Sequence, residues 1–375
     1  MKKIDSFEFN SLLIALQQNG YKTVGPTVQN EVIVYDEINS IDDLPVGWGD
    51  SQEGGKYRIK RRNDHSYFGY VLGPITWKKF LYPSVQKLWQ AKLTNSNFDI
   101  TSETVEETKY AFIGIRACEL KAIQIQDKVF TEGDFVNQTY KKIRDKIFIL
   151  AVNCVVTGGT CFCASMGAGP KVTGMFDLSL TEIITNDEHY FLVETGSERG
   201  IQILSGISSH DADDHEINSG NELINNASAN MGRSMNISGI EEILTNNFEH
   251  PEWEVVAEKC LSCANCTMVC PTCFCTTIND STDLRGEIAE RWQKWDSCFN
   301  ADFSYIHGGS IRSSTKSRYR QWMTHKLATW HGQFRSSGCV GCGRCITWCP
   351  VGIDITAEVQ AIRGSQQYQK TLNEE

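Results

Sequence analysis

Residues 260–271 read Cys-Leu-Ser-Cys-Ala-Asn-Cys-Thr-Met-Val-Cys-Pro, and residues 339–350 read Cys-Val-Gly-Cys-Gly-Arg-Cys-Ile-Thr-Trp-Cys-Pro. Both stretches have the spacing C-x2-C-x2-C-x3-C-P, which is the ligand pattern of paired [4Fe-4S] clusters. Each corner iron of a cubane needs one thiolate, and three closely spaced cysteines let a single tight loop hold three corners. The doubled run therefore predicts two [4Fe-4S] clusters and the transfer of single electrons.

The fourth cysteine of each run is predicted to bind the cluster of the other run, as it does in two-cluster ferredoxins. The first cluster then has the ligands Cys260, Cys263, Cys266 and Cys349, and the second has Cys339, Cys342, Cys345 and Cys270. Zinc sites usually place their ligands in two pairs across a longer gap. Two dense runs of four cysteines therefore argue against a pair of zinc knuckles.

Length and composition limit the classes of protein to which this chain can belong. The chain has 375 residues, 15 cysteines and a net charge of −10. Its length predicts two or three domains, and its acidic balance argues against a general nucleic-acid-binding protein. The first residues do not resemble a secretory signal, and no apolar run reaches the roughly 18 residues that a membrane span needs. We therefore expect a cytoplasmic protein with reduced cysteines, no membrane span and no nucleic-acid partner.

The predicted fold class is α+β, with a mixed α/β domain at residues 1–245 and a dicluster ferredoxin-like domain at residues 246–375. In the first domain, apolar runs at Tyr110–Ile115 and Lys146–Val152 flank a helical pattern at Glu119–Phe130. Two buried runs separated by a helix predict a βαβ unit with parallel strands.

Two further stretches lie near the predicted boundary. The polar segment Ser208–Ser238 predicts a surface loop or linker. Residues 276–335 separate the two cysteine runs and predict a helical insertion. Its first predicted helix has apolar residues at helical steps, and these are Leu284, Ile288, Trp292, Trp295 and Phe299. Its second predicted helix carries Tyr319, Trp322, Met323, Leu327 and Trp330.

Four cysteines lie in the first domain, and these are Cys118, Cys154, Cys161 and Cys163. Cys118 and Cys154 each follow a predicted strand, and sites gather at the C-terminal ends of strands in α/β sheets. Glycines in Gly158–Pro170 would let the backbone approach a bound group closely. We hypothesise a third [4Fe-4S] cluster with these four ligands. The irregular spacing leaves a zinc site, or a set of buried or reactive thiols, as alternatives.

Other features have two interpretations each. Cys273, Cys275 and Cys298 are expected to be buried packing residues, with a redox or substitute-ligand role as the alternative. A basic run is formed by Arg312, Lys316, Arg318 and Arg320. It predicts a solvated helix face. The functional alternatives are a docking face for an acidic partner and compensation for the negative charge of the clusters. No glycine-rich nucleotide-binding motif follows a strand. We therefore predict no catalytic residue in this chain and expect substrate chemistry on another subunit.

The first cysteine run, continued to Cys275, resembles the beta, iron–sulfur subunit of cytoplasmic NiFe sulfhydrogenases. It is also similar to the matching component of siroheme-dependent anaerobic sulfite reductases. The second run, continued to Asp354, resembles the same family. The resemblance extends to segments along most of the chain, and these are Leu44–Pro45, Gly73–Pro74, Gly114–Leu120, Gly158–Pro170, Trp295–Phe299, Arg318–Trp322 and Thr324–Lys326.

This resemblance implies a non-catalytic electron-relay subunit of an oxidoreductase complex. Its implied partners are the small and large subunits of a NiFe hydrogenase, together with a flavin- and NAD(P)-binding subunit. A siroheme sulfite reductase is the alternative terminal partner. The resemblance also favours the third cluster, because its four cysteines fall in or beside matching segments. A free ferredoxin-like carrier is the alternative from a different class, although a carrier needs little beyond its clusters.

Overall fold

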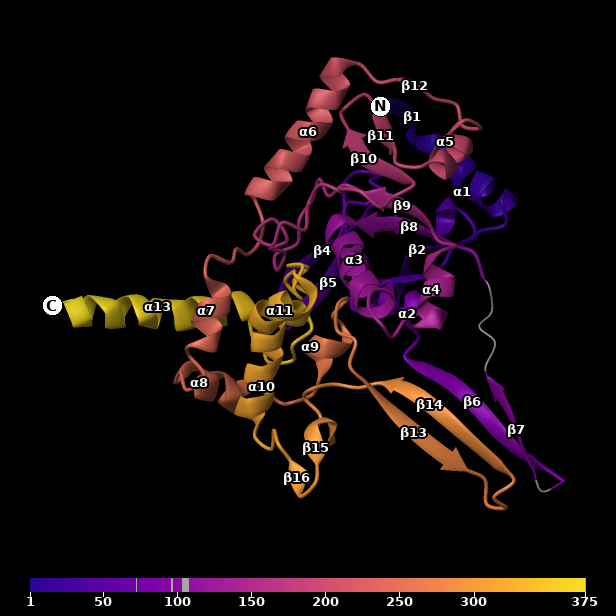
Figure 1. Cartoon of the computed structure of the whole chain (residues 1–375). Coiled ribbons are helices and arrows are strands. Elements are labelled where there is room, and N and C mark those ends of the chain that lie inside the picture. The colour runs from indigo at the N-terminus through magenta and orange to yellow at the C-terminus, as the bar shows by residue number, and fades with distance from the viewer. Residues whose placement is uncertain (72, 96, 103–107, 375) are drawn as a thin grey trace.

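The computed structural model describes residues 1–71, 73–95, 97–102 and 108–374 of the chain. Figure 1 shows three parts: an upper lobe built on a large sheet, a helical lobe toward the C-terminus, and a four-stranded arm that projects from both. The cysteine-rich loops lie where the two lobes meet, and residues of both lobes hold them in place.

The upper lobe is built on an eight-stranded sheet with the order β12-β1-β11-β10-β9-β8-β2-β3. Its strands are β1 (Lys2–Asp5), β2 (Lys22–Gln29), β3 (Val32–Glu37), β8 (Tyr110–Arg116), β9 (Phe148–Val152), β10 (Leu178–Ile184), β11 (His189–Thr195) and β12 (His210–Asp211). The four central strands β2, β8, β9 and β10 run parallel, and the outer pairs are antiparallel. Every residue of β9 is buried, as expected for a strand covered on both faces.

Helices pack on this sheet and join its strands. They are η1 (Ser6–Glu8), α1 (Phe9–Gln18), η2 (Ile41–Asp43), α2 (Lys78–Leu81), α3 (Ala117–Thr131), α4 (Gln138–Arg144), α5 (Glu198–Leu204) and α6 (Asp214–Ala229). α3 packs on β8 and β9 and connects these parallel strands, so the predicted βαβ unit is confirmed. A separate two-stranded ribbon of β4 (Trp48–Glu53) and β5 (Lys56–Arg61) lies beside them.

The prediction of a loop at Ser208–Ser238 is wrong, because α6 occupies its centre. The Asp213 carboxylate accepts the Glu216 N–H at 2.8 Å, and the Glu216 carboxylate accepts the Asp213 N–H at 3.0 Å. This capping box starts the helix although the segment has few apolar residues. A narrow buried stripe of Gly220, Ile224 and Ala227 is enough to hold α6 against β10 and β11.

The prediction of a helix in the first half of the insertion is also wrong. Residues 276–295 form a hairpin of β13 (Thr276–Thr282) and β14 (Ile288–Trp295), which pairs with β6 (Val85–Thr94) and β7 (Asn97–Ser102) in the order β13-β14-β6-β7. The Asp283 carboxylate accepts the N–H groups of Glu287 and Ile288, which closes the hairpin loop rather than starting a helix. Residues 288–295 form a strand because they pair with the distant β6, and the local spacing of apolar residues does not reveal this pairing.

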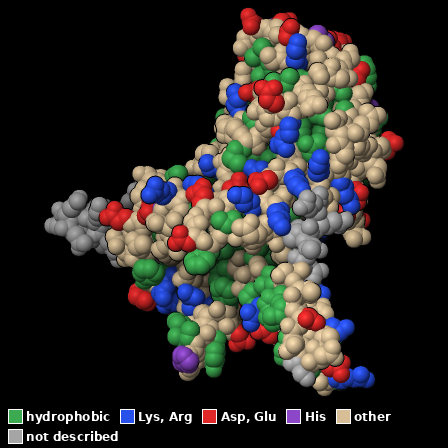
Figure 2. All heavy atoms as spheres, turned by 45° about the vertical axis from the view of Figure 1, so that its right-hand side comes forward, with side chains coloured by type: hydrophobic (Ala, Val, Ile, Leu, Met, Phe, Trp, Pro, Cys, Tyr) green, Lys and Arg blue, Asp and Glu red, His purple; other side chains and the backbone are tan. Residues whose placement is uncertain are grey.

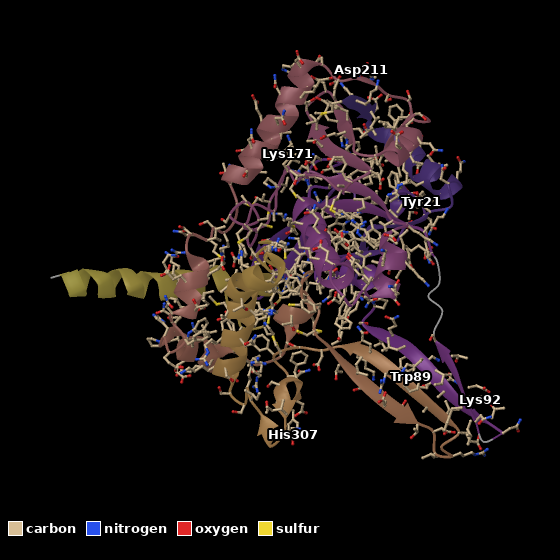
Figure 3. All side chains as sticks on the ribbon, viewed as in Figure 1. Tyr21, Trp89, Lys92, Lys171, Asp211 and His307 are labelled. Atoms are coloured by element: carbon tan, nitrogen blue, oxygen red, sulfur yellow. The ribbon has the colours of Figure 1, made fainter. Side chains whose placement is uncertain are left out.

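This sheet forms the arm. Trp89 and Lys92 are labelled on it in Figure 3, away from the two lobes. Figure 2 shows apolar side chains gathered where the arm meets the rest of the molecule.

The helical lobe follows in the last third of the chain. Its elements are α7 (Ile240–Thr245), α8 (Glu252–Lys259), α9 (Asn265–Met268), η3 (Ala301–Ser304), β15 (Tyr305–Ile306), β16 (Gly309–Ser310), α10 (Thr315–Thr324), the π-helix η4 (His325–Thr329), α11 (Trp330–Phe334), α12 (Arg344–Thr347) and α13 (Ile355–Glu374). The second predicted insertion helix forms as α10, η4 and α11. Trp253, Tyr319, Trp322 and Met323 form the core of this lobe. None of the helices in the described ranges is both long and apolar enough to cross a membrane.

A carboxyl pair joins α8 and α13 and makes the stability of this lobe depend on pH. Burial, followed by a hydrogen bond with Glu252, raises the pKa of Glu358 from 4.5 to about 7. The folded state therefore binds more protons than the unfolded state between about pH 4.5 and pH 7, so stability falls as pH rises through this window. We expect Glu358→Gln to flatten this slope and to raise the free energy of unfolding by about 1–3 kcal/mol at pH 8. Chemical denaturation at a series of pH values measures both effects, and an unchanged slope would contradict the assignment.

Candidate iron-sulfur centres

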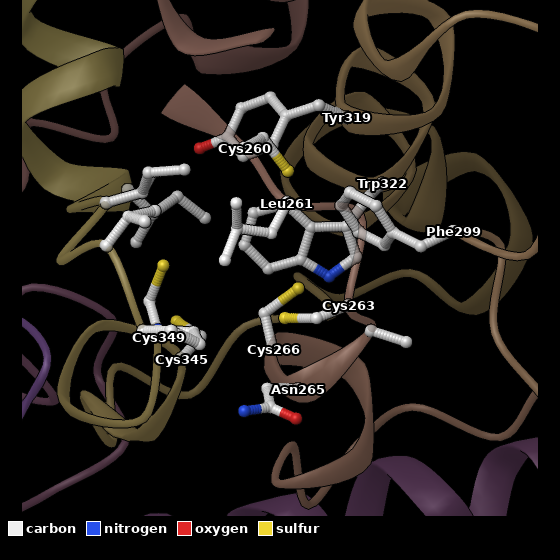
Figure 4. A pocket seen from close by; sticks show the side chains of 15 residues that line it. Cys260, Leu261, Cys263, Asn265, Cys266, Phe299, Tyr319, Trp322, Cys345 and Cys349 are labelled. Atoms are coloured by element: carbon white, nitrogen blue, oxygen red, sulfur yellow. The ribbon is translucent and has the colours of Figure 1, made fainter. Parts of the chain in front are cut away.

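Four thiols of the first predicted set line one pocket. Figure 4 shows Cys260, Cys263, Cys266 and Cys349 around a common space, with the rings of Tyr319 and Trp322 on its wall. Cys260 follows α8, Cys266 lies in α9, and Cys349 follows α12. The space, including its open mouth, is about 460 Å³. The structure therefore brings this predicted set together inside an apolar wall.

The two cysteine loops have the same backbone design. Ser262 and Ala264, two and four residues after Cys260, have φ angles of 51° and 64°. Gly341 and Gly343, at the matching places after Cys339, have φ angles of 66° and 74°. In each loop the N–H two residues after the first cysteine donates to its Sγ at 3.4 Å. Alternating left-handed residues turn successive N–H groups toward one centre, which suits a negatively charged cluster.

The second loop needs glycine where the first has serine and alanine. A Cβ at Gly341 would lie 2.6 Å from the carbonyl carbon of Phe162, and one at Gly343 would lie 2.3 Å from the oxygen of Thr160. The Phe162 N–H also donates to the Gly341 oxygen at 2.8 Å. The second cysteine loop is thus pressed against the segment that holds Cys161 and Cys163, and no side chain fits between them.

A buried lysine lies at one side of the second predicted set, Cys339, Cys342, Cys345 and Cys270. The Lys326 ammonium donates to the Cys270 Sγ at 3.2 Å and to the Gly338 oxygen, next to Cys339, at 3.1 Å. Burial raises the pKa of Cys339 to about 12 and that of Cys342 to about 11, so these thiols ionise only when iron takes the place of the proton. Cys339, Cys342 and Cys345 each interact electrostatically with Cys270, so thiols of both runs lie near one another, as ligation of one cluster by both runs requires.

Lys326 lies in the π-helix, a helix type that often marks functional sites. Burial opposes its charge, but the neighbouring Cys270 and Cys273 outweigh burial and hold the pKa of Lys326 well above its ordinary value. The same lysine also donates to Thr272 Oγ1 at 2.9 Å, so three acceptors hold its ammonium in place. A fixed cation beside a cluster stabilises the more negative, reduced state.

We expect Lys326→Met to lower the reduction potential of the second cluster by roughly 50–100 mV, the Coulomb energy of one charge at several ångströms in a polarisable interior. A potentiometric titration followed by electron paramagnetic resonance measures the shift. Lys316→Met is the matched control. Lys316 lies in α10, the helix that precedes the π-helix, but its ammonium pairs with Glu249 and Glu254 at the surface. Equal shifts in both variants would contradict a specific role for Lys326.

The third predicted set also shares one pocket. Cys118, Cys154, Cys161 and Cys163 line it together with Cys342. Cys118 lies in the first turn of α3, directly after β8, and Cys154 follows β9. The prediction that sites gather at this edge of the parallel sheet thus agrees with the geometry.

Two buried arginines flank this pocket. The Arg344 guanidinium forms an ion pair with Glu119 at 2.6 Å and donates to the Gly73 oxygen at 2.9 Å. Arg116 donates to the oxygens of Phe68 and Tyr70 and lies 4.0 Å from the Cys154 Sγ. These cations would offset the negative charge of four thiolates and a cluster.

The pKa values of two thiols in the third set, Cys118 and Cys154, are raised above the ordinary value for cysteine. A hydrogen bond with Cys163, together with burial, holds the pKa of Cys118 well above its ordinary value. Burial raises the pKa of Cys154 to about 11, against the opposing effect of Arg116. Such thiols are inert when protonated and become strong ligands only when a metal displaces the proton. Among the described residues, no three His, Cys, Asp or Glu side chains converge on one point as a single ion requires. The four thiols line one space of about 420 Å³, including its open mouth.

The comparisons with known proteins agree with the cysteine geometry. The family described as a 4Fe-4S dicluster domain matches residues 259–353. The chain contains this domain. The sulfhydrogenase 2 subunit beta of Pyrococcus furiosus is 27% identical over 364 residues, which cover 96% of this chain and 98% of that protein. The resemblance to the beta subunit of sulfhydrogenases is therefore confirmed. No solved structure matches the chain.

Sequence reasoning missed the cations of the dicluster domain and its surroundings. Lys326, Arg344 and Arg116 are all buried. In the basic run, Arg318 donates to Ser262 Oγ in the first cysteine loop at 3.3 Å, while Lys316 and Arg320 pair with Glu249. These contacts favour charge compensation and lobe packing over a docking face for an acidic partner. The signal available in the sequence was that all three missed cations lie in the segments that resemble the family, namely Gly114–Leu120, Thr324–Lys326 and the second cysteine run.

Proposed function

We propose that this chain is the iron–sulfur, electron-relay subunit of a hydrogenase-type oxidoreductase, with three [4Fe-4S] clusters held in a row. The observation that carries this proposal is the sharing of cysteines between neighbouring sites. Cys345 of the second set lines the pocket of the first set, and Cys342 of the second set lines the pocket of the third. The second cluster would therefore lie between the other two.

When bound, each cluster supplies a centre that accepts and releases one electron. The residues of the chain fix the positions of the sites and keep water out. Phe299, Tyr319 and Trp322 wall the first site, while Arg116 and Arg344 supply positive charge at the third. Burial, hydrogen bonds to sulfur and nearby charge are the means by which a protein sets cluster potentials.

The first site is the one nearest to solvent. Cys263 is exposed, and the neighbouring Leu261 is 63% exposed and lies at the pocket rim. An exposed apolar side chain beside a cluster ligand suits a contact through which electrons enter or leave. The opposite end of the row, at the third site, would face the other partner.

The proposed partners are the subunits of a NiFe hydrogenase, together with a flavin- and NAD(P)-binding subunit, in a cytoplasmic complex. The similarity to a sulfhydrogenase beta subunit over nearly the whole chain supports this choice. Metal and chromophore analysis of the native complex, purified without oxygen, tests it. Nickel without siroheme absorbance is the expected result, and siroheme without nickel would move the chain to a sulfite reductase.

The third cluster has its own test. Cys161→Ser should lower the iron content by about four atoms per chain while the signals of the other two clusters persist. Cys161 suits this test because it lines the third pocket and neither of the other predicted sets includes it. Unchanged iron content would refute the third cluster and leave a two-cluster relay.

A further inference from the structure

Cys275 and Cys298 are two cysteines outside all three ligand sets that the fold brings into contact. The last pair of the β13–β14 ladder joins Thr276 to Trp295, and beyond it the Asp296 N–H donates to the Cys275 oxygen at 2.9 Å. The chain continues past Asp296 to Cys298, and the thiols of Cys275 and Cys298 share a hydrogen bond. The two residues lie 23 positions apart in sequence, and the β13–β14 hairpin brings the segments that carry them side by side.

The segment that carries Cys298 is held firmly. Ser297 is fully buried, and its hydroxyl is 2.7 Å from Thr267 Oγ1, which lies between the ligands Cys266 and Cys270. The same hydroxyl accepts the Phe299 N–H at 3.1 Å. On the other side, the Trp295 indole donates to the Tyr82 oxygen at 3.0 Å. The thiol pair is therefore fixed to the frame of the first and second cluster sites.

The pair lies close to the relay. Cys298 packs in the same apolar cluster as Cys266 and Cys345, which belong to the first and second ligand sets. Both Cys275 and Cys298 are half-buried, so protons can exchange with solvent.

The surroundings also favour ionisation of one thiol. The hydrogen bond from Cys298 lowers the pKa of Cys275 to about 7, in spite of its burial. A cation also lies nearby: the Lys78 ammonium is 3.8 Å from the centre of the Trp295 ring and donates to the Cys273 oxygen at 3.2 Å. One thiol close to ionisation beside a protonated partner is the arrangement that thiol–disulfide chemistry uses.

We propose that Cys275 and Cys298 form a reversible dithiol–disulfide pair that stores two electrons beside the relay. Reduction breaks the S–S bond and takes up two electrons and two protons, giving two thiols; oxidation releases them and forms the bond again. The electrons are exchanged one at a time with the neighbouring [4Fe-4S] clusters, and the protons with solvent. This inference rests on the proposed relay, because the clusters are its electron source and sink.

Differential alkylation with mass spectrometry tests the pair in the native complex, poised without oxygen at a series of potentials. We expect Cys275 and Cys298 to lose alkylation together as the potential rises, with a two-electron Nernst slope. Peptides containing the two residues should then appear linked by a disulfide, and lowering the potential should restore both thiols. Two thiols that stay reactive at every potential at which the clusters remain intact would overturn the proposal.

Three variants separate this test from the relay itself. Cys275→Ser and Cys298→Ser should abolish the linked peptide and keep the iron content of the parent, whereas loss of iron would assign these residues as ligands and overturn the proposal. Cys273→Ser is the matched control, because Cys273 lies two residues from Cys275 and should leave the 275–298 link intact. Failure of the relay is read separately, as an absence of cluster signals and iron in the parent complex.

Discussion

Replacing Cys339 with serine should remove about four irons per chain and slow electron transfer between the partners by on the order of 100-fold. Cys339 belongs to the set that would lie in the middle of the row, so its loss separates the two ends. Its Sγ accepts the Gly341 N–H at 3.4 Å, a contact that a serine oxygen cannot reproduce at the same length. Iron analysis and stopped-flow reduction of the terminal partner measure the two effects.

Cys273→Ser is the control for this variant, because it changes a nearby half-buried thiol that belongs to no predicted ligand set. It should keep the iron content of the parent. A Cys339→Ser protein with full iron content, or with full transfer between partners, would show that the second ligand set is assigned wrongly.

Replacing Arg344 with methionine should lower the free energy of unfolding by about 3–5 kcal/mol, because it leaves a buried carboxylate without its partner. The side chains of Arg344 and Glu119 are only 5% and 2% exposed, so solvent cannot screen the unpaired charge. Glu119 also accepts a hydrogen bond from the buried Tyr35 hydroxyl, which fixes the carboxylate in place. Denaturant unfolding of the protein, followed by circular dichroism without oxygen, measures the loss.

The double variant Glu119→Gln with Arg344→Met removes both charges and should recover much of the stability that the single variant loses. If the single and double variants lose the same free energy of unfolding, the loss comes from packing rather than from an unpaired charge. Because Arg344 also donates to the Gly73 oxygen, part of the loss is expected to persist in both.

The predictions that succeeded rest on chemistry carried within short segments. The cysteine spacing of residues 260–271 and 339–350 is a property of one loop each, and the two loops share one backbone design. The βαβ unit around α3 was likewise predictable, because its strands are continuous apolar runs and its helix has a clear period. In the third set, Cys118 and Cys154 follow parallel strands, where sites gather, whereas Cys161 and Cys163 lie in the glycine-rich segment Gly158–Pro170.

The loop prediction at Ser208–Ser238 failed although the local Asp213–Glu216 capping box marks the start of α6. Other features that the sequence did not reveal depend on contacts between distant segments. The spacing of Ile288, Trp292 and Trp295 fits a helix, but β14 pairs with β6, about 200 residues earlier in the chain. Nothing local to Lys326 reveals that a π-helix turns its ammonium toward Cys270. The contact between Cys275 and Cys298 depends on the arm hairpin, which brings the two segments together. Tertiary pairing overrides local propensity in each of these cases.

Counting iron and acid-labile sulfide per chain in the anaerobically purified protein tests the three-cluster relay most directly. Three cubanes predict about twelve irons and about twelve sulfides per chain, with three reducible centres in a potentiometric titration. About eight of each would contradict the third centre and limit the relay to the dicluster domain. Zinc in place of iron at the third set would contradict its role in electron transfer altogether.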